Sequence, residues 1–282
     1  MLRASLRVLD GSDLDAALAV CDRDIPANLF VASRLRAHGI ARSGGGELWG
    51  YYDEGTLTSL CWSGANLVPV EAGPAAIEAY AARARRHGRQ CSSIVGPAPV
   101  VLDLWARLAP YWSVPREVRE DQPLMTIDGP PRVPADPLVR RSRPDELEQV
   151  LPACVAMFTE EVGYSPVIAD GGSLYQSQVG ALVLGGRSLV RMARTAEGQR
   201  VVFKAELGSV TRDAVQVQGV WVNPLHRGQG LAAPGMAAVV EICRRDVAPT
   251  VSLYVNGFNT RAVRVYERVG FRRVDTFATV LF

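Results

Sequence analysis

The feature that most constrains the fold of this chain is a glycine-containing turn between a strand-like run and an amphipathic helix. Residues 214–222 (AVQVQGVWV) are rich in valine, which favours an extended strand. Residues 223–232 (NPLHRGQGLA) form the turn. A helix follows, with apolar side chains at helical spacing: Met236, Val240, Cys243 and Val247. A strand that passes directly into a helix needs a second layer to bury both apolar faces, which predicts an α/β fold.

The same alternation of strands and helices extends over residues 138–282. The expected elements are, in order, a strand at 138–141, helices at 142–163 and 174–184, hairpin strands at 188–193 and 200–207 around Ala196, Glu197 and Gly198, the strand, turn and helix already described, a strand at 251–255, a helix at 260–269 and closing strand residues at 271–282. This order predicts an α+β arrangement in which helices pack on a mixed sheet.

A proline-rich segment divides the chain. Residues 129–137 read GPPRVPADP, and their four prolines remove backbone donors and favour an extended linker. At 282 residues the chain is also longer than the usual single-core domain. We therefore predict a first domain at 1–128, a linker at 129–137 and a second domain at 138–282.

The amino-terminal part repeats the order of the second domain faintly. Its expected elements are a strand at 3–9, helices at 12–21 and 27–38, a hairpin at 47–62, a helix at 74–87, a strand at 91–95 and a helix at 100–108. A duplication with one decayed half is the leading hypothesis, and an unrelated α/β accessory domain is the alternative. The segment nearest to a second glycine turn, residues 92–99, follows the wrong strand and has few free amides.

Composition excludes several classes of partner. The 31 basic and 29 acidic residues nearly balance, so we expect neither nucleic acid nor a membrane surface as partner. No run of about 18 apolar residues is present to span a bilayer. Five scattered cysteines lack the spacing of zinc or redox sites, so we expect reduced, buried thiols, no metal and a cytoplasmic location. The oligomeric state is left open.

The turn at residues 223–232 has the properties of an anion site. Glycine lacks the Cβ that keeps a ligand away from the backbone. The free amides of the first helical turn, backed by the helix dipole, attract negative charge. Arg227 adds a permanent positive charge. Tight turns need glycine in any fold, so this turn alone is weak evidence for an anion site. The segments before and after it in the sequence strengthen that interpretation.

At these residues the chain resembles the GNAT superfamily of acyl-CoA-dependent N-acyltransferases. The family's cofactor motif is matched by Arg227, Gly230 and Ala232. Its later motif is matched by Asn259, Ala262, Tyr266, Gly270 and Phe271. The resemblance covers about residues 138–282, and the layout looks like the two-domain GNAT proteins of high-GC bacteria. It implies a GNAT fold, with a degenerate, non-binding GNAT-like first domain that shapes or covers the acceptor site.

The resemblance also implies how an acyl-CoA binds. The strands at 214–222 and 251–255 would splay apart in a V, and the pantetheine arm of acetyl-CoA, or of another acyl-CoA, would lie between them. The main chain that pairs with pantetheine would be that of Val220, Trp221 and Val222. The amides that hold the diphosphate would be those of Arg227, Gly228, Gln229, Gly230, Leu231 and Ala232. Asn259 would contact the cofactor or, alternatively, cap the last helix.

Two kinds of reacting group are expected. Tyr266 matches the family tyrosine that protonates the departing thiolate, although a core aromatic at this position is the alternative. Many relatives carry a carboxylate on the strand before the loop, where this chain has Gln216 and Gln218. The candidate bases are therefore Glu160, Glu161 and Glu206, although adjacent carboxylates at a helix end are usually solvated surface.

Two further segments are candidates for contacts with the acceptor and with the cofactor. Residues 158–164 (FTEEVGY) are the expected part of the acceptor wall. Arg261, Arg264 and Arg268 either meet a 3′-phosphate or form a charged solvent face.

The predicted function is transfer of acetyl from acetyl-CoA to a primary amine by direct attack in a ternary complex. The acceptor is left open between a small molecule, an antibiotic, a peptide terminus and a protein lysine. Because the strand carboxylate is missing, a catalytically silent acyl-CoA sensor or scaffold is the alternative.

Overall fold

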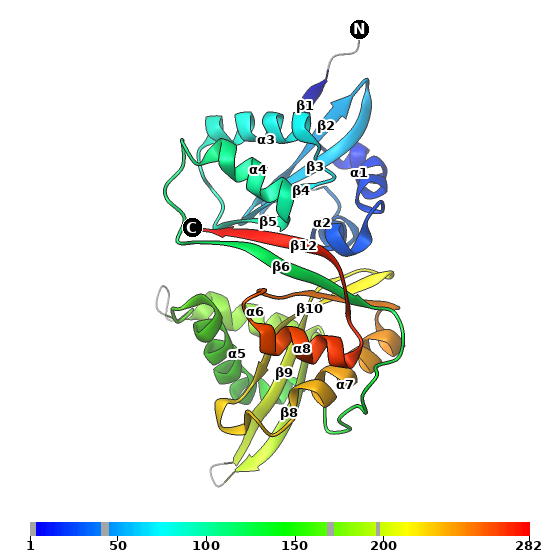
Figure 1. Ribbon diagram of the computed structural model, residues 1–282, viewed down its shortest axis with the longest axis vertical. Helices are drawn as coiled ribbons and strands as arrows, with labels where there is room; N and C mark the ends of the chain where they lie inside the picture. Colours follow the sequence, from blue (N-terminus) through cyan, green and yellow to red (C-terminus); the bar gives the residue numbers. More distant parts are fainter. Residues whose placement is uncertain (1–3, 41–44, 168–171, 196–197) are drawn as a thin grey trace. The chain divides into compact units, whose positions relative to one another are not determined.

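The computed structural model describes residues 4–40, 45–167, 172–195 and 198–282. They form two compact units (Figure 1). The first unit comprises the described residues up to Met125 together with Tyr254–Asn259 and Arg273–Phe282. The second comprises the described residues of Thr126–Leu253 and Thr260–Arg272. The second unit therefore lacks the last strand of the predicted second domain, 138–282, because most of that strand belongs to the first unit.

The first unit is a mixed sheet with helices on both faces. Its elements are β1 (Ser5–Val8), α1 (Leu14–Cys21), α2 (Ile25–His38), β2 (Gly46–Asp53), β3 (Thr56–Gly64), β4 (Asn66–Val70), α3 (Pro74–His87), β5 (Ser93–Pro97), α4 (Ala98–Leu108), most of β6 (Glu117–Ile127) and most of β12 (Arg272–Leu281). The strand order is β1-β2-β3-β4-β5-β12-β6. Strands β1 to β4 pair antiparallel, β4 and β5 pair parallel, and β5 and β12 pair antiparallel.

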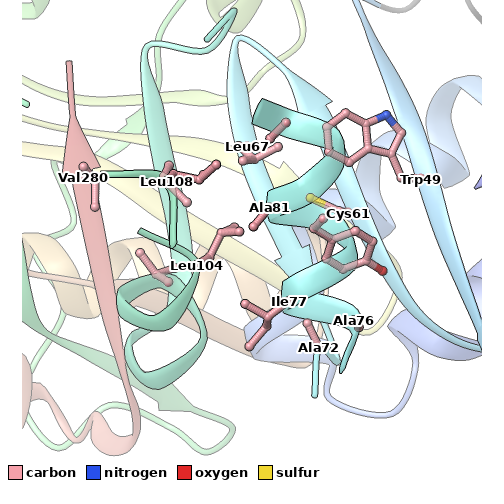
Figure 2. Close-up of a cluster of buried hydrophobic side chains, with 14 of the residues drawn as sticks. Trp49, Cys61, Leu67, Ala72, Ala76, Ile77, Ala81, Leu104, Leu108 and Val280 are labelled. Atoms are coloured by element: carbon pink, nitrogen blue, oxygen red, sulfur yellow. The ribbon is translucent and has the colours of Figure 1, made fainter. Parts of the chain in front are cut away.

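Alternation of side chains along the strands separates two cores in this unit. Trp49 and Cys61 face α3 and α4, and Figure 2 shows them in one cluster of buried side chains with Ile77, Leu104 and Val280. The intervening strand residues point to the opposite face, where α1 and α2 cover a second cluster of buried side chains. Two strands of this unit, β4 and β6, were not predicted.

The second unit repeats this plan. Its elements are β7 (Arg140–Arg141), α5 (Leu147–Val162), α6 (Ser173–Leu184), β8 (Ser188–Thr195), β9 (Gly198–Val210), β10 (Ala214–Val222), α7 (Ala232–Asp246), β11 (Thr250–Tyr254, whose last residue belongs to the first unit) and α8 (Thr260–Val269). The strand order is β7-β8-β9-β10-β11, antiparallel except for the parallel pair of β10 and β11.

Helices again cover both faces of the sheet. Val150 and Val179, of α5 and α6, share a core with Trp221. Helix α7 packs against the face on which Phe203 lies, and Gly235 admits the phenyl ring because a Cβ there would lie 2.8 Å from it. Helices α7 and α8 are neighbours (Figure 1).

The two halves of the chain share one order of elements. Each half has a strand, two helices, three antiparallel strands, a helix, a parallel strand, a helix and a last strand, and the last strand of the second half, β12, lies mostly in the first unit. The duplication hypothesis required related strand orders, and the structure has them. The predicted hairpin is confirmed as β8 and β9, although residues 196–197 of its turn lie outside the described residues. Among the described residues, no helix is both long and apolar enough to cross a lipid bilayer.

Candidate functional site

Strands β10 and β11 pair only near their beginnings. The paired residues are Ala214 with Thr250, Val215 with Val251 and Gln216 with Ser252, and none of the later described residues of β10 has a partner on β11. On its other edge β10 remains paired with β9 as far as Val222. The final residues of β10 therefore keep one edge open for a ligand, as the predicted split between these strands requires.

A β-bulge lies in β10 within this open segment. Gln218 pairs with Glu206 and Trp221 pairs with Lys204, so β10 advances three residues while β9 advances two. The extra residue bends the strand and changes its register. Gly219 occupies the bulge with a φ of 56°, in the left-handed region that favours glycine.

The turn that follows β10 leaves backbone amides open. Gly228 and Gly230 have φ angles of 79° and 77°, and an added Cβ at either residue would meet no atom within 4 Å. Within the described part of the chain, the N–H groups of residues 228–231 find no acceptor. Helix α7 begins next, at Ala232, and its 15 residues direct the positive end of the helix dipole toward the turn. Open amides without Cβ atoms fit a diphosphate.

Arg227, at the start of this turn, is held by α5. Its Nη2 donates to Glu160 Oε2 at 2.5 Å, and its Nε donates to the Val222 carbonyl at 3.0 Å. The second carboxylate oxygen, Glu160 Oε1, accepts from Trp221 Nε1 at 3.1 Å. Glu160 thus joins the end of α5 to the end of β10 and to the turn. It was predicted as a base, and in the structure its two carboxylate oxygens accept hydrogen bonds from Trp221 and Arg227.

Tyr266 is a buried phenol on α8. Its exposed fraction is 7%, and its ring meets Phe271 edge to face with centroids 5.9 Å apart. Burial, and then the negative charge of Glu161, raise the pKa of Tyr266 well above its usual range. The hydroxyl therefore keeps its proton at neutral pH. The packing agrees with the core-aromatic alternative, and the raised pKa makes this phenol a weaker acid than an exposed tyrosine.

Aromatic side chains cluster at the end of α5. The Phe158 ring lies edge to face with Tyr164 and with Tyr175, at centroid distances of 5.7 and 5.4 Å. Tyr175 donates its hydroxyl proton to the Cys154 carbonyl at 2.9 Å. Burial raises the pKa of Tyr175, and the charge of Glu161 contributes to the shift. Sequence analysis placed Phe158 and Tyr164 in the acceptor wall but missed Tyr175, which comes from the next helix.

Glu206 is buried in an ion pair. Its exposed fraction is 5%, and Oε1 accepts from Lys204 Nζ at 2.6 Å and from Cys154 Sγ at 3.3 Å. Lys204 is fully buried and also donates to the Gly219 carbonyl at 3.1 Å. Burial raises the pKa of the Cys154 thiol to about 12, so that the thiol is inert. Lys204 was missed, although a lysine in the apolar run VVFKAEL was a signal.

The remaining predicted ligand contacts are Asn259 and three arginines of α8. Asn259 belongs to the first unit, where its N–H donates to the Asn256 carbonyl at 2.8 Å, so its cofactor contact stays a prediction. Arg261, Arg264 and Arg268 are exposed on α8. Across the described residues, no three His, Cys, Asp or Glu side chains are grouped to hold a metal ion.

Two family models match the chain. Residues 46–150 match a domain of unknown function (DUF4081), and residues 183–271 match the acetyltransferase (GNAT) family. A curated relative, the mycothiol acetyltransferase of Brachybacterium faecium, is 37% identical over 70 residues. That stretch is 25% of this chain and 21% of the relative, so the similarity covers about a fifth of that protein.

Solved structures share the fold of the whole chain. A GCN5-related N-acetyltransferase from Sphaerobacter thermophilus matches with a TM-score of 0.64 and 17% identity, covering 100% of this chain and 96% of its own. A tandem GNAT protein from the clavulanic acid biosynthesis pathway matches with a TM-score of 0.57 and 14% identity. This match covers 99% of this chain and 98% of the other. Residues 183–271 thus resemble the GNAT family of acetyltransferases, and the chain as a whole has the fold of two GNAT-like domains in tandem.

Proposed function

We propose that the second unit transfers an acetyl group from acetyl-CoA to a primary amine, by direct attack within a ternary complex. The observation that carries this proposal is the pair of open features at the end of β10. One is a strand edge without a partner, and the other is a turn whose amides face open space at Gly228 and Gly230. Together they match the shape of a pantetheine diphosphate.

Each part of the co-substrate has proposed partners. The main chain of Val220, Trp221 and Val222 pairs with the pantetheine amides along the open edge. The amides of residues 228–232 receive the diphosphate, with the dipole of α7 behind them, whereas the Arg227 N–H donates to the Pro224 carbonyl at 3.3 Å. Arg227 supplies further positive charge next to this turn.

The chemistry needs a proton for the sulfur and a way to remove one from the nitrogen. The amine nitrogen attacks the thioester carbonyl carbon, a C–N bond forms, and the C–S bond breaks to release the thiolate of CoA. Tyr266 is the proposed acid, and its hydroxyl donates a proton to the sulfur as the C–S bond breaks. The tyrosinate regains a proton from solvent before the next cycle.

The proposed base for the amine is Glu161. Glu161 lies in the last turn of α5, and its negative charge contributes to the raised pKa of Tyr266, the proposed acid, and of Tyr175, in the aromatic cluster. We propose that its carboxylate accepts the proton that the attacking amine loses.

A catalytically silent acyl-CoA sensor is the second candidate. It is favoured by Gln216 and Gln218, which stand on β10 where many relatives carry a carboxylate. Calorimetry with CoA and acetyl-CoA, followed by incubation of acetyl-CoA with small-molecule amines, peptides and lysine-bearing proteins, separates the two. Release of free thiol on any amine supports the enzyme, binding without turnover supports the sensor, and no heat with either ligand rejects both.

The cellular location is proposed on chemical grounds. All five cysteines are free and buried, which suits a reducing compartment. We propose that the protein works in the cytoplasm, where the reduced state of these thiols is maintained.

A further inference from the structure

The second unit buries an ion pair that the proposed chemistry does not use. Lys204 and Glu206 lie on the face of β9 that is covered by α5, with exposed side-chain fractions of 0% and 7%. Their charged atoms are 2.6 Å apart. Removing two charges from water is costly, and apolar side chains of similar volume often give equal or greater stability. Stability alone therefore does not account for this pair.

The contacts of the pair lead to the bulge in β10. Lys204 Nζ donates its second hydrogen bond to the Gly219 carbonyl, at 3.1 Å. A Cβ on Gly219 would lie 3.0 Å from Glu206 Oε2 and 3.1 Å from the Met157 methyl group. The bulge is thus held through its carbonyl by the ammonium, and it packs closely against the carboxylate and α5.

The bulge lies within the open edge, which begins after Gln216. The Gly219 carbonyl accepts from the side chain of Lys204, and the register between β9 and β10 shifts between the pairs of Gln218 and Trp221. This register shift sets which backbone groups of Val220 and Val222 face the open edge. A change in the bulge would displace the hydrogen-bonding groups offered to an extended ligand.

We propose that Lys204 is a positioning residue, with Glu206 as its counter-ion, which holds the Gly219 bulge so that residues 220–222 align with the pantetheine arm of an acyl-CoA. This inference rests on the proposed function. Lys204 then affects the binding of the pantetheine arm and not that of the diphosphate. The turn proposed to bind the diphosphate is held separately, by the ion pair of Glu160 and Arg227.

The test removes both charges together, so that no unpaired charge stays buried. The double variant Lys204→Met, Glu206→Leu is compared with the wild type in three measurements. We expect faster amide hydrogen exchange in a peptide covering residues 218–222. We also expect acetyl-CoA to bind about tenfold more weakly, the equivalent of roughly one or two main-chain hydrogen bonds. Binding of adenosine 3′-phosphate 5′-diphosphate, which lacks the pantetheine arm, should be unchanged.

A second ion pair in the same unit provides the matched control. Glu146 has an exposed fraction of 4% and accepts from Arg140 at 2.6 Å, away from the bulge. The double variant Arg140→Met, Glu146→Leu should change thermal stability while leaving the affinity ratio of the two ligands as in the wild type. A general loss of stability would affect both double variants alike and would not separate the ligands.

A single variant covers the case in which the first double variant does not fold. Gly219→Ala adds a Cβ against Glu206 and Met157 at a φ of 56°, and so displaces the bulge without removing a charge. It should weaken acetyl-CoA binding and spare the adenosine nucleotide in the same way.

Three results are decisive. Wild-type acetyl-CoA affinity and wild-type exchange at 218–222 in the double variant would overturn the positioning role. Equal weakening of both ligands would overturn it as well. Absence of acetyl-CoA binding to the wild type would instead reject the proposed function, and the exchange measurement would still decide whether the pair holds the bulge.

Discussion

The turns after β4 and after β10 occupy the same place in the two units and differ in what they offer to a ligand. Each turn follows the first strand of a parallel pair and leads into a helix. Between β10 and α7 the turn has nine residues, 223–231, and between β4 and α3 it has three, 71–73. The shorter turn lacks the glycines with positive φ that open the longer one.

Charge differs between the turns as well as length. In the first unit, Glu71 has a φ of 52°, and its Oε1 accepts from Asn28 Nδ2 at 2.8 Å. A carboxylate therefore lies beside the start of α3, where the second unit has Arg227. The comparison teaches that the shared fold supplies a helix start in both units, whereas an anion site also needs glycines and a favourable charge.

The candidate counterpart predicted from the sequence lies elsewhere in the first unit. Residues 92–99 contain strand β5 itself and the start of α4, so they do not form the turn that follows β4. The equivalent turn is Glu71 to Gly73. It was missed because β4 was not predicted, and Pro69 within that strand explains the omission.

The largest expected effect tests whether chemistry belongs to the second unit alone. Tyr266→Phe should lower turnover about 10²-fold while sparing acetyl-CoA affinity, because only the proton donor is lost. Tyr80→Phe makes the same change at a buried tyrosine of the first unit, whose hydroxyl bonds to Ser59 at 2.8 Å. It should reduce stability and leave turnover unchanged. Unchanged turnover in Tyr266→Phe, measured by thiol release, would remove Tyr266 from the mechanism.

The next effect tests the two turns directly. Gly230→Ala places a Cβ at a φ of 77°, so the backbone must move and the amides lose their alignment. Acetyl-CoA affinity should fall about thirtyfold, or roughly 2 kcal/mol, by calorimetry. Gly73→Ala is the control in the first unit, since Gly73 has a φ of −78° and open space around it. Equal affinities of the two variants would contradict the assignment of the diphosphate to the longer turn.

A smaller effect compares the buried carboxylates of the two units in acid. The hydrogen bond from Arg140 holds the pKa of Glu146 at about 2, and that from Arg7 holds the pKa of Asp13 at about 2. A lowered pKa stabilises the folded state above the unfolded pKa, near 4.5 for Glu146 and 3.8 for Asp13, and this stability is lost as pH falls toward 2.

The corresponding variants are Arg140→Met and Arg7→Met. Each should cost about 1 kcal/mol in urea unfolding at neutral pH, a figure reduced for solvent screening because both arginines are more than a third exposed. The difference from the wild type should disappear near pH 2. A cost that persists unchanged at that pH would mean that lost packing, and not the ion pair, is responsible.

The smallest effect concerns the carboxylate next to Arg227. Glu160→Gln keeps an acceptor for Trp221 Nε1 and removes a negative charge 2.5 Å from the guanidinium. Acetyl-CoA affinity should rise about threefold at low salt and less at high salt, because the pair is partly exposed. Turnover at saturation should be unchanged. A large loss of turnover would restore Glu160 as the base in place of Glu161.

The candidate site was predictable only where its parts are close in sequence. The turn with Gly228 and Gly230, the strand before it and the helix after it form one continuous segment, and local rules for glycine and for helix starts apply to it. Glu160 was proposed as a base because its contacts could not be foreseen. Its two partners, Trp221 and Arg227, are 61 and 67 residues away in the chain.

By itself the sequence determined the strand, turn and helix of residues 214–246, the limits of the helices at 74–87 and 260–269, and the order that revealed the duplication. These features depend on spacing along one segment, which the chain carries wherever it folds. Tertiary structure alone decided that β12 joins the first unit beside β5, that Lys204 holds the bulge at Gly219, and that Glu160 binds the turn. Each of these depends on pairing between distant segments, which local spacing does not encode.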